Sequence, residues 1–432
     1  MSASISSEFQ STSTLQCRIH RGCHEIGGNC VELKAQGKRI LLDLGLPLSD
    51  DSTPLIPPYL DLLNSDESLL GIFISHPHPD HFGLLQFISK PEEGHSTIPV
   101  YIGQEGLGIL QNSQLFTRNA GLDDLNLKPF QPGAVFEVGP FTITPYRIDH
   151  SAHDSYCFLI EVAGKRLFYS GDIRAHGRSA HYFRDLVLNP PADIDVLICE
   201  GTRVGHVEDF RYPTEDSVTE AMAEEFKHTP GLGLAWCSAQ NIDRLVSIYN
   251  ACRITDRTFV IDVYTAEVLR AVSRDDIPLP GRPGVRVYLP RSQRRRIKQE
   301  EAYSTSNKYH SFRVYPEQLR ATPSKFVMLC RSSMFAELAE ADGLSGATLI
   351  TSLWSGYLKE EREAARLNDL RAMGVRQTHI HCSGHATVDE LKQFIAAFPN
   401  SRIIPIHLDD REGFKELSVN VELKNDGEWW GV

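Results

Sequence analysis

The sequence predicts an α/β protein, and two observations support this prediction. Short apolar stretches that favour strands alternate with stretches that favour amphipathic helices along most of the 432 residues. Four of the predicted strands end in a lone acidic residue or in a histidine cluster, at Asp43, His76–His81, Asp172 and Glu200. Ligand sites in α/β sheets lie beyond the carboxyl ends of strands. We therefore expect these four strand ends to meet in one site.

The chain begins with a segment, Met1–Gln16, that is rich in serine and threonine and lacks the apolar stretch of a signal peptide. We therefore expect residues 1–16 to form a disordered lead. Residues 17–45 follow as a strand, a turn and a second strand, which Asp43 closes. A polar, proline-rich connection over residues 47–66 leads to the next strand.

This next strand runs into the segment His76–His81, which reads HPHPDH. Its two prolines favour extended backbone, in which side chains alternate, so His76, His78 and Asp80 can point the same way. His81 takes a different heading. Ligands on two headings suit two neighbouring metal ions, and the absence of cysteine from the segment favours nitrogen and oxygen ligands, as catalytic zinc prefers.

More strands are expected in the first half, over residues 98–103, 136–146, 156–162, 166–172 and 193–199. His150 lies between the second and third of these, Asp172 closes the fourth, and Glu200 follows the fifth. A single acid in such a position is most often a helix cap or a turn former. The repetition of the pattern is what favours a shared site.

The pattern changes near residue 204. The segment Ser217–Glu220 has the S-x-x-E form of a capping box and predicts the start of a helix. A second helix and several strands follow before residue 354, so this region is expected to form a second α/β unit. Within it, Arg291–Lys298 is a dense basic run. Such a run is most often a solvated surface and otherwise a contact for phosphates.

Histidines return near the end of the chain. A helix is predicted over Lys359–Met373, and His381 and His385 follow it closely. A last strand, Arg402–Ile406, is followed directly by His407. The strand-to-ligand pattern of the first half is thus repeated after the second unit.

Composition narrows the class of protein. The net charge of −12 disfavours a general affinity for nucleic acids, although a local basic groove could still bind phosphates. The nine cysteines are scattered without a CxxC pair, which argues against a thiolate cluster and a disulfide framework and indicates a reducing cytoplasm. No run of 18 apolar residues is present, so no membrane span is expected.

The segment His76–His81 matches the HxHxDH motif of the metallo-β-lactamase superfamily, which the chain resembles. His150 and Asp172 lie where later ligands of that superfamily lie, and Asp43 matches its structural aspartate. The resemblance implies an αββα sandwich.

The second half resembles the β-CASP nucleases, since Glu200, His385 and His407 match the three motifs that this branch adds. In that branch an α/β domain is inserted into the sandwich. The resemblance thus implies residues 17–203 and 359–432 as the two parts of the metallo-β-lactamase domain, with the β-CASP domain at 204–358.

Within this branch the chain is most similar to the ribonuclease J group, through Gly22–Cys30 (GCHEIGGNC) and Ser383–Ala386 (SGHA). The chain departs from the group in two ways. It extends about 25 residues beyond His407, where a C-terminal domain is usual, and Leu329–Met334 replaces a glycine- and glutamine-rich segment. These departures leave the direction of cleavage and the mode of assembly open.

The resemblance implies two zinc ions per chain. The ligands that it implies are His76, His78 and His150 for the first zinc, Asp80, His81 and His407 for the second, and Asp172 as the bridge. It implies Asp80, His385 and Glu200 as catalytic residues, with His385 beside the scissile phosphate. Glu200 and Asp43 would also hold other side chains in place.

The same resemblance implies contacts with the substrate phosphates. The residues concerned are Ser238, Ser352, Ser355 and His381. For each serine, a turn or a helix cap is an equally good interpretation.

The function implied is hydrolysis of single-stranded RNA through a metal-bridging hydroxide, by 5′-to-3′ exonuclease action with some endonuclease action. A DNA-directed nuclease and a small-molecule hydrolase of the same fold are the alternatives. A catalytically inactive scaffold would have lost ligands, and all the expected ones are present. We expect a cytoplasmic protein with no membrane contact, and a homo-oligomer stays open.

Overall fold

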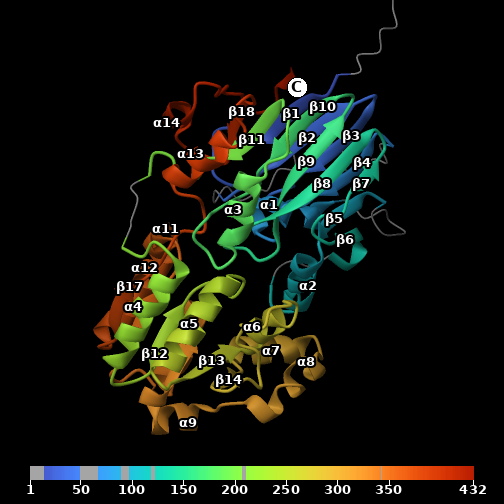
Figure 1. Cartoon of the computed structure of the whole chain (residues 1–432). Coiled ribbons are helices and arrows are strands. Elements are labelled where there is room, and N and C mark those ends of the chain that lie inside the picture. Colours follow the sequence, from blue (N-terminus) through green and yellow to red (C-terminus); the bar gives the residue numbers. More distant parts are fainter. Residues whose placement is uncertain (1–13, 49–66, 89–96, 118–121, 207–210, 342) are drawn as a thin grey trace, which may run out of the picture.

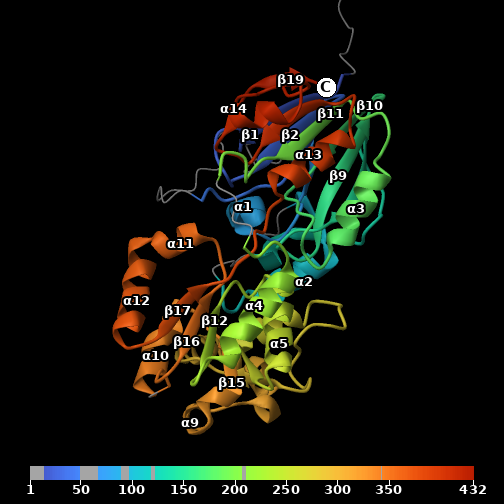
Figure 2. The same cartoon turned by 60° about the vertical axis from the view of Figure 1, so that its left-hand side comes forward.

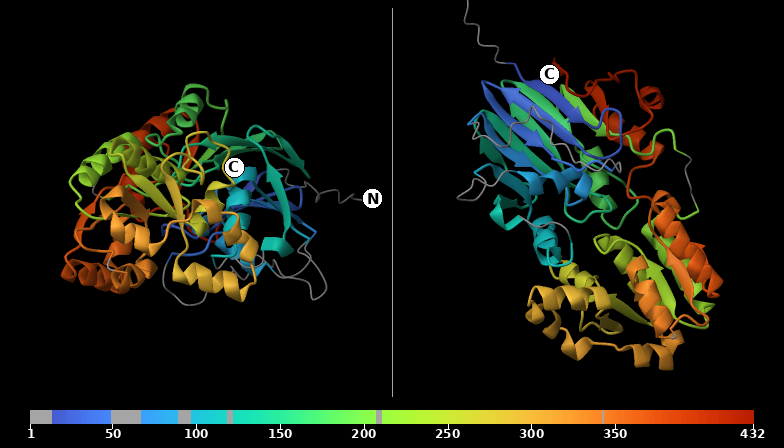
Figure 3. Two further views of the ribbon diagram at one scale, coloured as in Figure 1. Left: turned by 90° about the horizontal axis from the view of Figure 1, so that it is seen from below. Right: turned by 180° about the vertical axis from the view of Figure 1, so that it is seen from behind.

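The structure is a computed structural model, and it describes residues 14–48, 67–88, 97–117, 122–206, 211–341 and 343–432 (Figure 1). These residues form two lobes, one above the other in Figure 1, and the view from behind shows the same division (Figure 3). The first lobe holds two sheets and the second lobe holds one.

The first sheet has seven strands in the order β19-β1-β2-β3-β4-β5-β6. Its strands are β1 (Gln16–Arg21), β2 (Cys30–Ala35), β3 (Lys38–Leu42), β4 (Leu69–Phe73), β5 (Pro99–Gly103), β6 (Asn126–Phe130) and β19 (Trp429–Gly431). The last strand of the chain thus pairs with the first, antiparallel. Strands β3 to β6 are parallel, so their carboxyl ends lie at one edge of the sheet.

The second sheet has six strands in the order β18-β11-β10-β9-β8-β7. Its strands are β7 (Phe136–Val138), β8 (Phe141–Ile148), β9 (Ser155–Val162), β10 (Lys165–Tyr169), β11 (Val196–Glu200) and β18 (Arg402–Ile406). Strands β10, β11 and β18 are parallel, so Glu200, which ends β11, and Asp172 and His407, which follow β10 and β18, lie at one edge of the sheet.

The two sheets of the first lobe face each other across a shared apolar core. Ile19, Val31, Phe158 and Ile198 from both sheets are fully buried in it. Phe183 of α3 (Ala180–Leu188) and Phe394 of α13 (Val388–Ala396) cover the outer face of the second sheet. Leu107 of α2 (Gln104–Ser113) covers the outer face of the first. The result is an αββα sandwich, and this predicted fold class is confirmed.

The third sheet is inserted between β11 and β18, and all its strand pairs are parallel. Its order is β14-β13-β15-β12-β16-β17, with β12 (Gly233–Trp236), β13 (Thr258–Asp262), β14 (Val285–Tyr288), β15 (Phe326–Leu329), β16 (Thr348–Thr351) and β17 (Arg376–His379). A separate apolar cluster lies on each of its faces, as expected for a parallel sheet covered by helices on both sides.

Helices of the second lobe cover these two faces (Figure 2). They are α4 (Glu215–Lys227), α5 (Ile242–Ile254), α6 (Val263–Leu269), α7 (Arg291–Gln299), α9 (Pro316–Ala321), α10 (Phe335–Glu340) and α12 (Glu361–Ala372). Two short helices of this lobe, α8 (Tyr303–Asn307) and α11 (Ser355–Lys359), add no residue to either apolar cluster. Two short helices of the first lobe, α1 (Pro79–Phe82) and α14 (Arg411–Phe414), follow β4 and β18.

Several predicted boundaries differ from the structure. Strand β17 pairs with β16, so the segment after Lys359 returns to the first lobe only after residue 379 and not at 359. We keep the start of the insert near 204 as a proposal. Helix α4 begins at Glu215 because Thr214, and not Ser217, is the capping residue: its side chain accepts from the Ser217 amide.

The start of the chain also differs from the prediction. Most of the predicted lead, and residues 49–66 of the proline-rich connection, lie outside the described residues. Leu15 is buried and Gln16 begins β1, so the ordered part reaches into the predicted lead. Residues 17–45 hold three strands, because a turn at Gln36 and Gly37, both with positive φ, splits the segment.

The nine cysteines are all unpaired and buried, in agreement with the prediction of no disulfide framework. Within the described ranges, none of the helices combines the length and the apolar character that crossing a bilayer requires.

Candidate metal centre

Asp43 directly follows β3 and fixes the position of the histidine loop through hydrogen bonds to Ser75 and His81. Its carboxylate accepts hydrogen bonds from the Ser75 amide and the Ser75 hydroxyl, both at 2.7 Å. The hydroxyl of Tyr169 donates to it at 2.7 Å, and Nδ1 of His81 lies at 2.7 Å. Because Nδ1 of His81 donates to this carboxylate, its Nε2 is left as a lone-pair donor.

The first cluster of potential ligands combines the loop with two later strand ends. His76, His78, His150 and Asp172 each offer one atom within 4.8 Å of the others. Nε2 of His76 and Nε2 of His150 lie 3.6 and 3.7 Å from Oδ2 of Asp172. Nδ1 of His78 lies 3.2 Å from Nε2 of His150. The three rings therefore converge on one point beside Asp172.

The second cluster shares Asp172 with the first. It consists of Asp80, His81, Asp172 and His407. Nε2 of His81 lies 3.2 Å from Oδ2 of Asp172, and Nε2 of His407 lies 3.3 Å from Oδ2 of Asp80. Asp172 is the one side chain common to both clusters, which is the place of a bridging ligand.

Several atoms that point into these clusters have no hydrogen-bond partner among the described residues. They are Nε2 of His76, Nε2 of His81 and both carboxylate oxygens of Asp172. Asp172 is 1% exposed, and a buried carboxylate without donors is costly. A divalent cation at each cluster would satisfy all four atoms, so the donor set fits two metal ions with nitrogen and oxygen ligands.

The titration behaviour of three of the rings agrees with this fit. Burial lowers the pKa of His76 and His150 well below the usual range and that of His78 to about 4, so these rings are neutral at neutral pH. Burial also opposes protonation of a fourth ring, His81, but the Asp172 and Asp43 carboxylates outweigh this and raise its pKa well above the usual range, so metal binding at its Nε2 would displace a proton. Burial opposes ionisation of Asp172, but His407 and His81 lower its pKa well below the usual range. Neutral imidazoles and an ionised carboxylate are the forms that bind metal.

Glu200 lies behind the centre and supports the side chains around it. Its carboxylate accepts from the Ile173 amide at 2.8 Å and from the Thr202 hydroxyl at 2.6 Å. Both of its oxygens lie 3.3 Å from Nδ1 of His385. Glu200 is thus placed to fix the loop after Asp172 and the ring of His385.

His385 stands at the open side of the two clusters. Its Nδ1 lies 3.7 Å from Oδ2 of Asp172, and its side chain is 22% exposed. Burial lowers its pKa, but the Glu200 and Asp172 carboxylates outweigh this and raise it to about 9. It is more exposed than His76, His81, His150 and His407, as a ring that meets a substrate would be.

Sequence reasoning missed three residues that orient the ligands. Ser75 accepts from Nδ1 of His76 at 3.0 Å while donating to Asp43. Thr202 donates to Glu200 and accepts from Nδ1 of His407 at 2.8 Å. With Tyr169, these hydroxyls fix the ring orientations. The signal in the sequence was their adjacency to motif residues, but hydroxyls near a motif are too common to single out.

The predicted phosphate contacts are not assembled as expected. Ser352 is 2% exposed; its hydroxyl donates to the Ile380 carbonyl and accepts from Nη1 of Arg244, so it is not available to a phosphate. His381 accepts from the same guanidinium at 3.1 Å. Ser238 and Ser355 are exposed. In this structure a buried arginine that the sequence does not reveal uses the hydroxyl of Ser352, and the phosphate contacts of the four residues stay predictions.

The basic run forms helix α7, and its residues serve different purposes. Gln293 and Ile297 are buried, Arg291 pairs with Glu340, and Nε of Arg296 donates to the Leu115 carbonyl. Arg294, Arg295 and Lys298 are exposed. A contact between this helix and nucleic acid stays a proposal.

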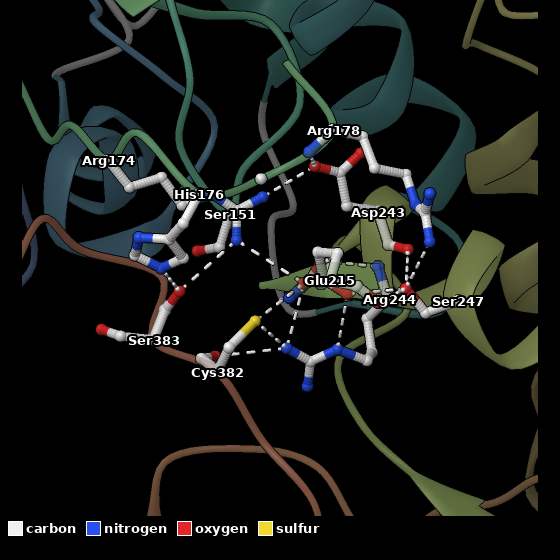
Figure 4. A network of polar contacts seen from close by, with 12 residues as sticks. Ser151, Arg174, His176, Arg178, Glu215, Asp243, Arg244, Ser247, Cys382 and Ser383 are labelled. Carbon is white, nitrogen blue, oxygen red and sulfur yellow. Dashed lines mark hydrogen bonds and ion pairs between the residues drawn. The ribbon is translucent and has the colours of Figure 1, made fainter. Parts of the chain in front are cut away.

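A network of buried charges connects the loops behind the centre to the second lobe (Figure 4). Arg174, two residues after Asp172, pairs with Asp149 at 3.3 Å and with Asp243 of α5 at 2.7 Å. Arg244 donates to both carboxylate oxygens of Glu215 at 3.0 Å. Arg174, Arg244 and Glu215 are at most 2% exposed. These contacts join the two lobes next to the centre.

The sequence of this chain is similar to those of known metallo-β-lactamase-fold proteins and nucleases. Residues 38–247 match the model of the beta-lactamase superfamily domain. Ribonuclease J of Mycoplasma genitalium is 22% identical over 414 residues, which are 89% of this chain and 66% of that protein. Cleavage and polyadenylation specificity factor 73 of Drosophila melanogaster is 30% identical over 210 residues, 45% of this chain and 30% of that protein. The chain thus spans less than two thirds of either relative.

A solved structure supports the fold alone. A protein of unknown function from Enterococcus faecalis superposes with a TM-score of 0.74 over 97% of this chain and 100% of its own, at 18% identity. The matched domain model and the relatives support the metallo-β-lactamase superfamily, and within it a similarity to the β-CASP branch and to ribonuclease J.

Proposed function

We propose that the chain is a zinc-dependent ribonuclease that hydrolyses phosphodiester bonds of single-stranded RNA. The observation that carries this proposal is the pair of ligand clusters that share Asp172 and point unpartnered, buried atoms at one another. Ribonuclease J among the relatives supports RNA as the substrate.

Each residue of the centre has a role in this proposal. His76, His78 and His150 would hold the first zinc, Asp80, His81 and His407 the second, with Asp172 between them. Two zinc ions, when bound, supply Lewis acidity toward phosphate oxygens and lower the pKa of bound water to about 7. Asp43, Ser75 and Thr202 keep the rings aimed at the centre through the Nδ1 contacts described above.

His385 would act on the substrate itself. Glu200 accepts a hydrogen bond from the Nδ1–H of this ring. Because the pKa of His385 is raised to about 9, the ring is protonated on both nitrogens at neutral pH, and its Nε2–H can donate a hydrogen bond or a proton to an oxygen of the scissile phosphate. Glu200 therefore acts by orienting His385, and Asp80 acts as a ligand. We expect His385→Ala to retain its metals while cleavage slows by about 10²- to 10⁴-fold, the usual range for an acid or base.

The test measures metal content and cleavage on one sample. We expect elemental analysis to find close to two zinc ions per chain, and matched RNA and DNA oligonucleotides to show cleavage of the RNA that a chelator abolishes. An active protein with one tightly held metal would contradict the binuclear centre. Cleavage of DNA alone would refute the ribonuclease and leave the metal chemistry intact.

The direction of cleavage is a finer proposal. We favour 5′-to-3′ exonuclease action with some endonuclease action, although Ser352 no longer supports a pocket for a 5′-phosphate. End-labelled RNAs with a 5′-monophosphate, a 5′-hydroxyl or a 5′-triphosphate, together with a circular RNA, separate the modes. Release of mononucleotides chiefly from the monophosphate form supports the exonuclease, and efficient cutting of the circle shows an endonuclease.

A further inference from the structure

Two large aromatic side chains are exposed on a short helix of the second lobe. Trp354 is 60% exposed and Tyr357 is 45% exposed. Helix α11, which Trp354 precedes and Tyr357 belongs to, buries none of its residues. The two rings contact each other edge to face, with centroids 5.4 Å apart and planes at 89°. Neither ring is required by the apolar core.

The pair faces the lobe of the metal centre although it belongs to the other lobe. In Figures 1 and 2, α11 occupies the edge of the second lobe that faces the first, where α1 carries Asp80. The exposed rings therefore lie at the edge of the second lobe that faces the lobe of the metal centre.

The base of this helix is held firmly. Trp354 follows the end of β16 by three residues, and the intervening Ser352 donates its amide to the Trp236 carbonyl at 2.8 Å. The buried contacts of Ser352 with Arg244 and Ile380 fix the same point. An exposed ring on such a rigid support loses little conformational freedom when a ligand covers it.

Gly356 determines how the indole lies. A Cβ added at Gly356 would come within 2.1 to 2.5 Å of three atoms of the six-membered ring of Trp354. The ring thus lies against the glycine backbone, in space that any side chain at 356 would take. The opposite face of the indole is left for a ligand, which accounts for the high exposure of Trp354.

We propose that Trp354 is a stacking platform for a base of the single-stranded nucleic acid cleaved at the metal centre, with Tyr357 supporting the edge of the indole. This inference rests on the proposed nuclease function and adds a binding site to it. Stacking holds a strand without reading its sequence, because every base has a flat face. A platform on the second lobe, at the edge that faces the lobe of the metal centre, would position the strand between the two lobes.

A base suits this site better than a second protein surface does. Two aromatic side chains supply at most about 500 Å² of contact area. A stable protein interface needs about 800 Å² from each partner. One indole face, by contrast, is enough to cover one base.

The test compares intact and abasic RNA on three variants of the full chain. The RNAs have one sequence, with a single abasic residue placed at successive positions. Trp354→Ala removes the platform, Trp354→Phe keeps a smaller one, and Gly356→Ala displaces the indole without removing it. Tyr303→Ala is the matched control, since Tyr303 is an exposed aromatic residue, 51% exposed, on α8.

For the wild type, we expect the loss of one particular base to weaken binding by about 5- to 150-fold, the range measured for one stacked base. Trp354→Ala should bind the intact RNA as weakly as the wild type binds that abasic RNA, with the change in KM and not in kcat. Trp354→Phe should retain part of the preference, Gly356→Ala should lose most of it, and Tyr303→Ala should keep all of it.

Binding is measured in a His385→Ala background, where cleavage is slow, so that binding and cleavage are judged separately. Unchanged affinity of Trp354→Ala for intact RNA would overturn the stacking platform even if the wild type cleaves RNA. A change confined to the oligomeric mass would overturn it in favour of a protein contact. Base-dependent binding without cleavage supports the platform and refutes only the nuclease.

Discussion

The metal centre and the charge network beside it are both buried and both charged, yet their polar atoms are satisfied in opposite ways. At the centre, both oxygens of Asp172 and Nε2 of His76 have no partner among the described residues. In the network, Arg244 donates hydrogen bonds to both carboxylate oxygens of Glu215, and Asp243 accepts one from Arg174. The chain completes the network by itself, whereas the centre leaves buried atoms without a partner that a cation would satisfy. The comparison separates a binding site from a structural element of similar composition.

The largest expected effect comes from Asp172→Ala. This change removes the one ligand common to both clusters, so we expect both metals to be lost and cleavage to fall below that of His385→Ala. Elemental analysis and RNA cleavage measure the two effects. Asp185→Ala, an exposed acid on α3, is the matched control. If Asp172→Ala retained both metals, Asp172 would not be their shared ligand, and the contrast between a metal-binding centre and a self-contained charge network would fail.

Glu215→Ala tests the network. Arg244 would lose its carboxylate partner and Arg174 would lose one of three, and breaking a buried ion pair costs about 3–5 kcal/mol. We expect the free energy of unfolding of the metal-free chain to fall by that amount in a denaturant titration, whereas Asp172→Asn should cost less because its carboxylate has no donors to lose. Equal losses in the two variants would contradict the comparison.

The acid stability of the chain should depend on the same carboxylate. Burial disfavours ionised Glu215, but Arg244 outweighs it and lowers its pKa. Because the folded-state pKa lies below the unfolded value of about 4.3, this stabilisation is present above that pH and is lost progressively as the pH falls below it. We would measure the free energy of unfolding in an assay between pH 6 and pH 3. It should fall less steeply with decreasing pH in Glu215→Gln than in the wild type.

Thr202→Val tests whether the Thr202 hydroxyl orients a single metal ligand, His407. The valine keeps the shape but removes the hydroxyl that joins Glu200 to Nδ1 of His407. Residues that orient a metal ligand typically contribute about 10- to 100-fold to metal affinity. We expect competition with a chelator to show such a loss at one metal only. Loss of both metals would place Thr202 among the supports of the whole centre.

The smallest effect is expected from the basic helix α7. Replacing Arg294 and Arg295 by glutamine removes two exposed charges and spares Arg296, which bonds to Leu115. If both contact phosphates of a single strand, the slope of log K against log salt should flatten by about 0.7 per contact. An unchanged slope would make α7 an ordinary solvated surface.

Sequence alone determined the inner residues of the candidate site. The segment His76–His81 carries its candidate ligands at fixed spacing, Asp172 and His407 each follow a strand, and Glu200 ends one. Such patterns depend on neighbours in the chain, so the periodicity of a strand and the chemistry of its last residue can be seen without the fold. The αββα class with an insertion could be predicted for the same reason, through the motifs that resemble a known family.

Only the tertiary structure decided how these residues are supported. Thr202 and His407 are 205 positions apart, and Arg244 meets Ser352 across 108 positions, so no local pattern announces either contact. The predicted end of the insert at residue 358 differs from the structure for the same reason, because β17 is recognised only by its pairing with β16. Burial makes each polar atom require a partner, and which distant residue supplies it is fixed only when the sheets and helices are in place.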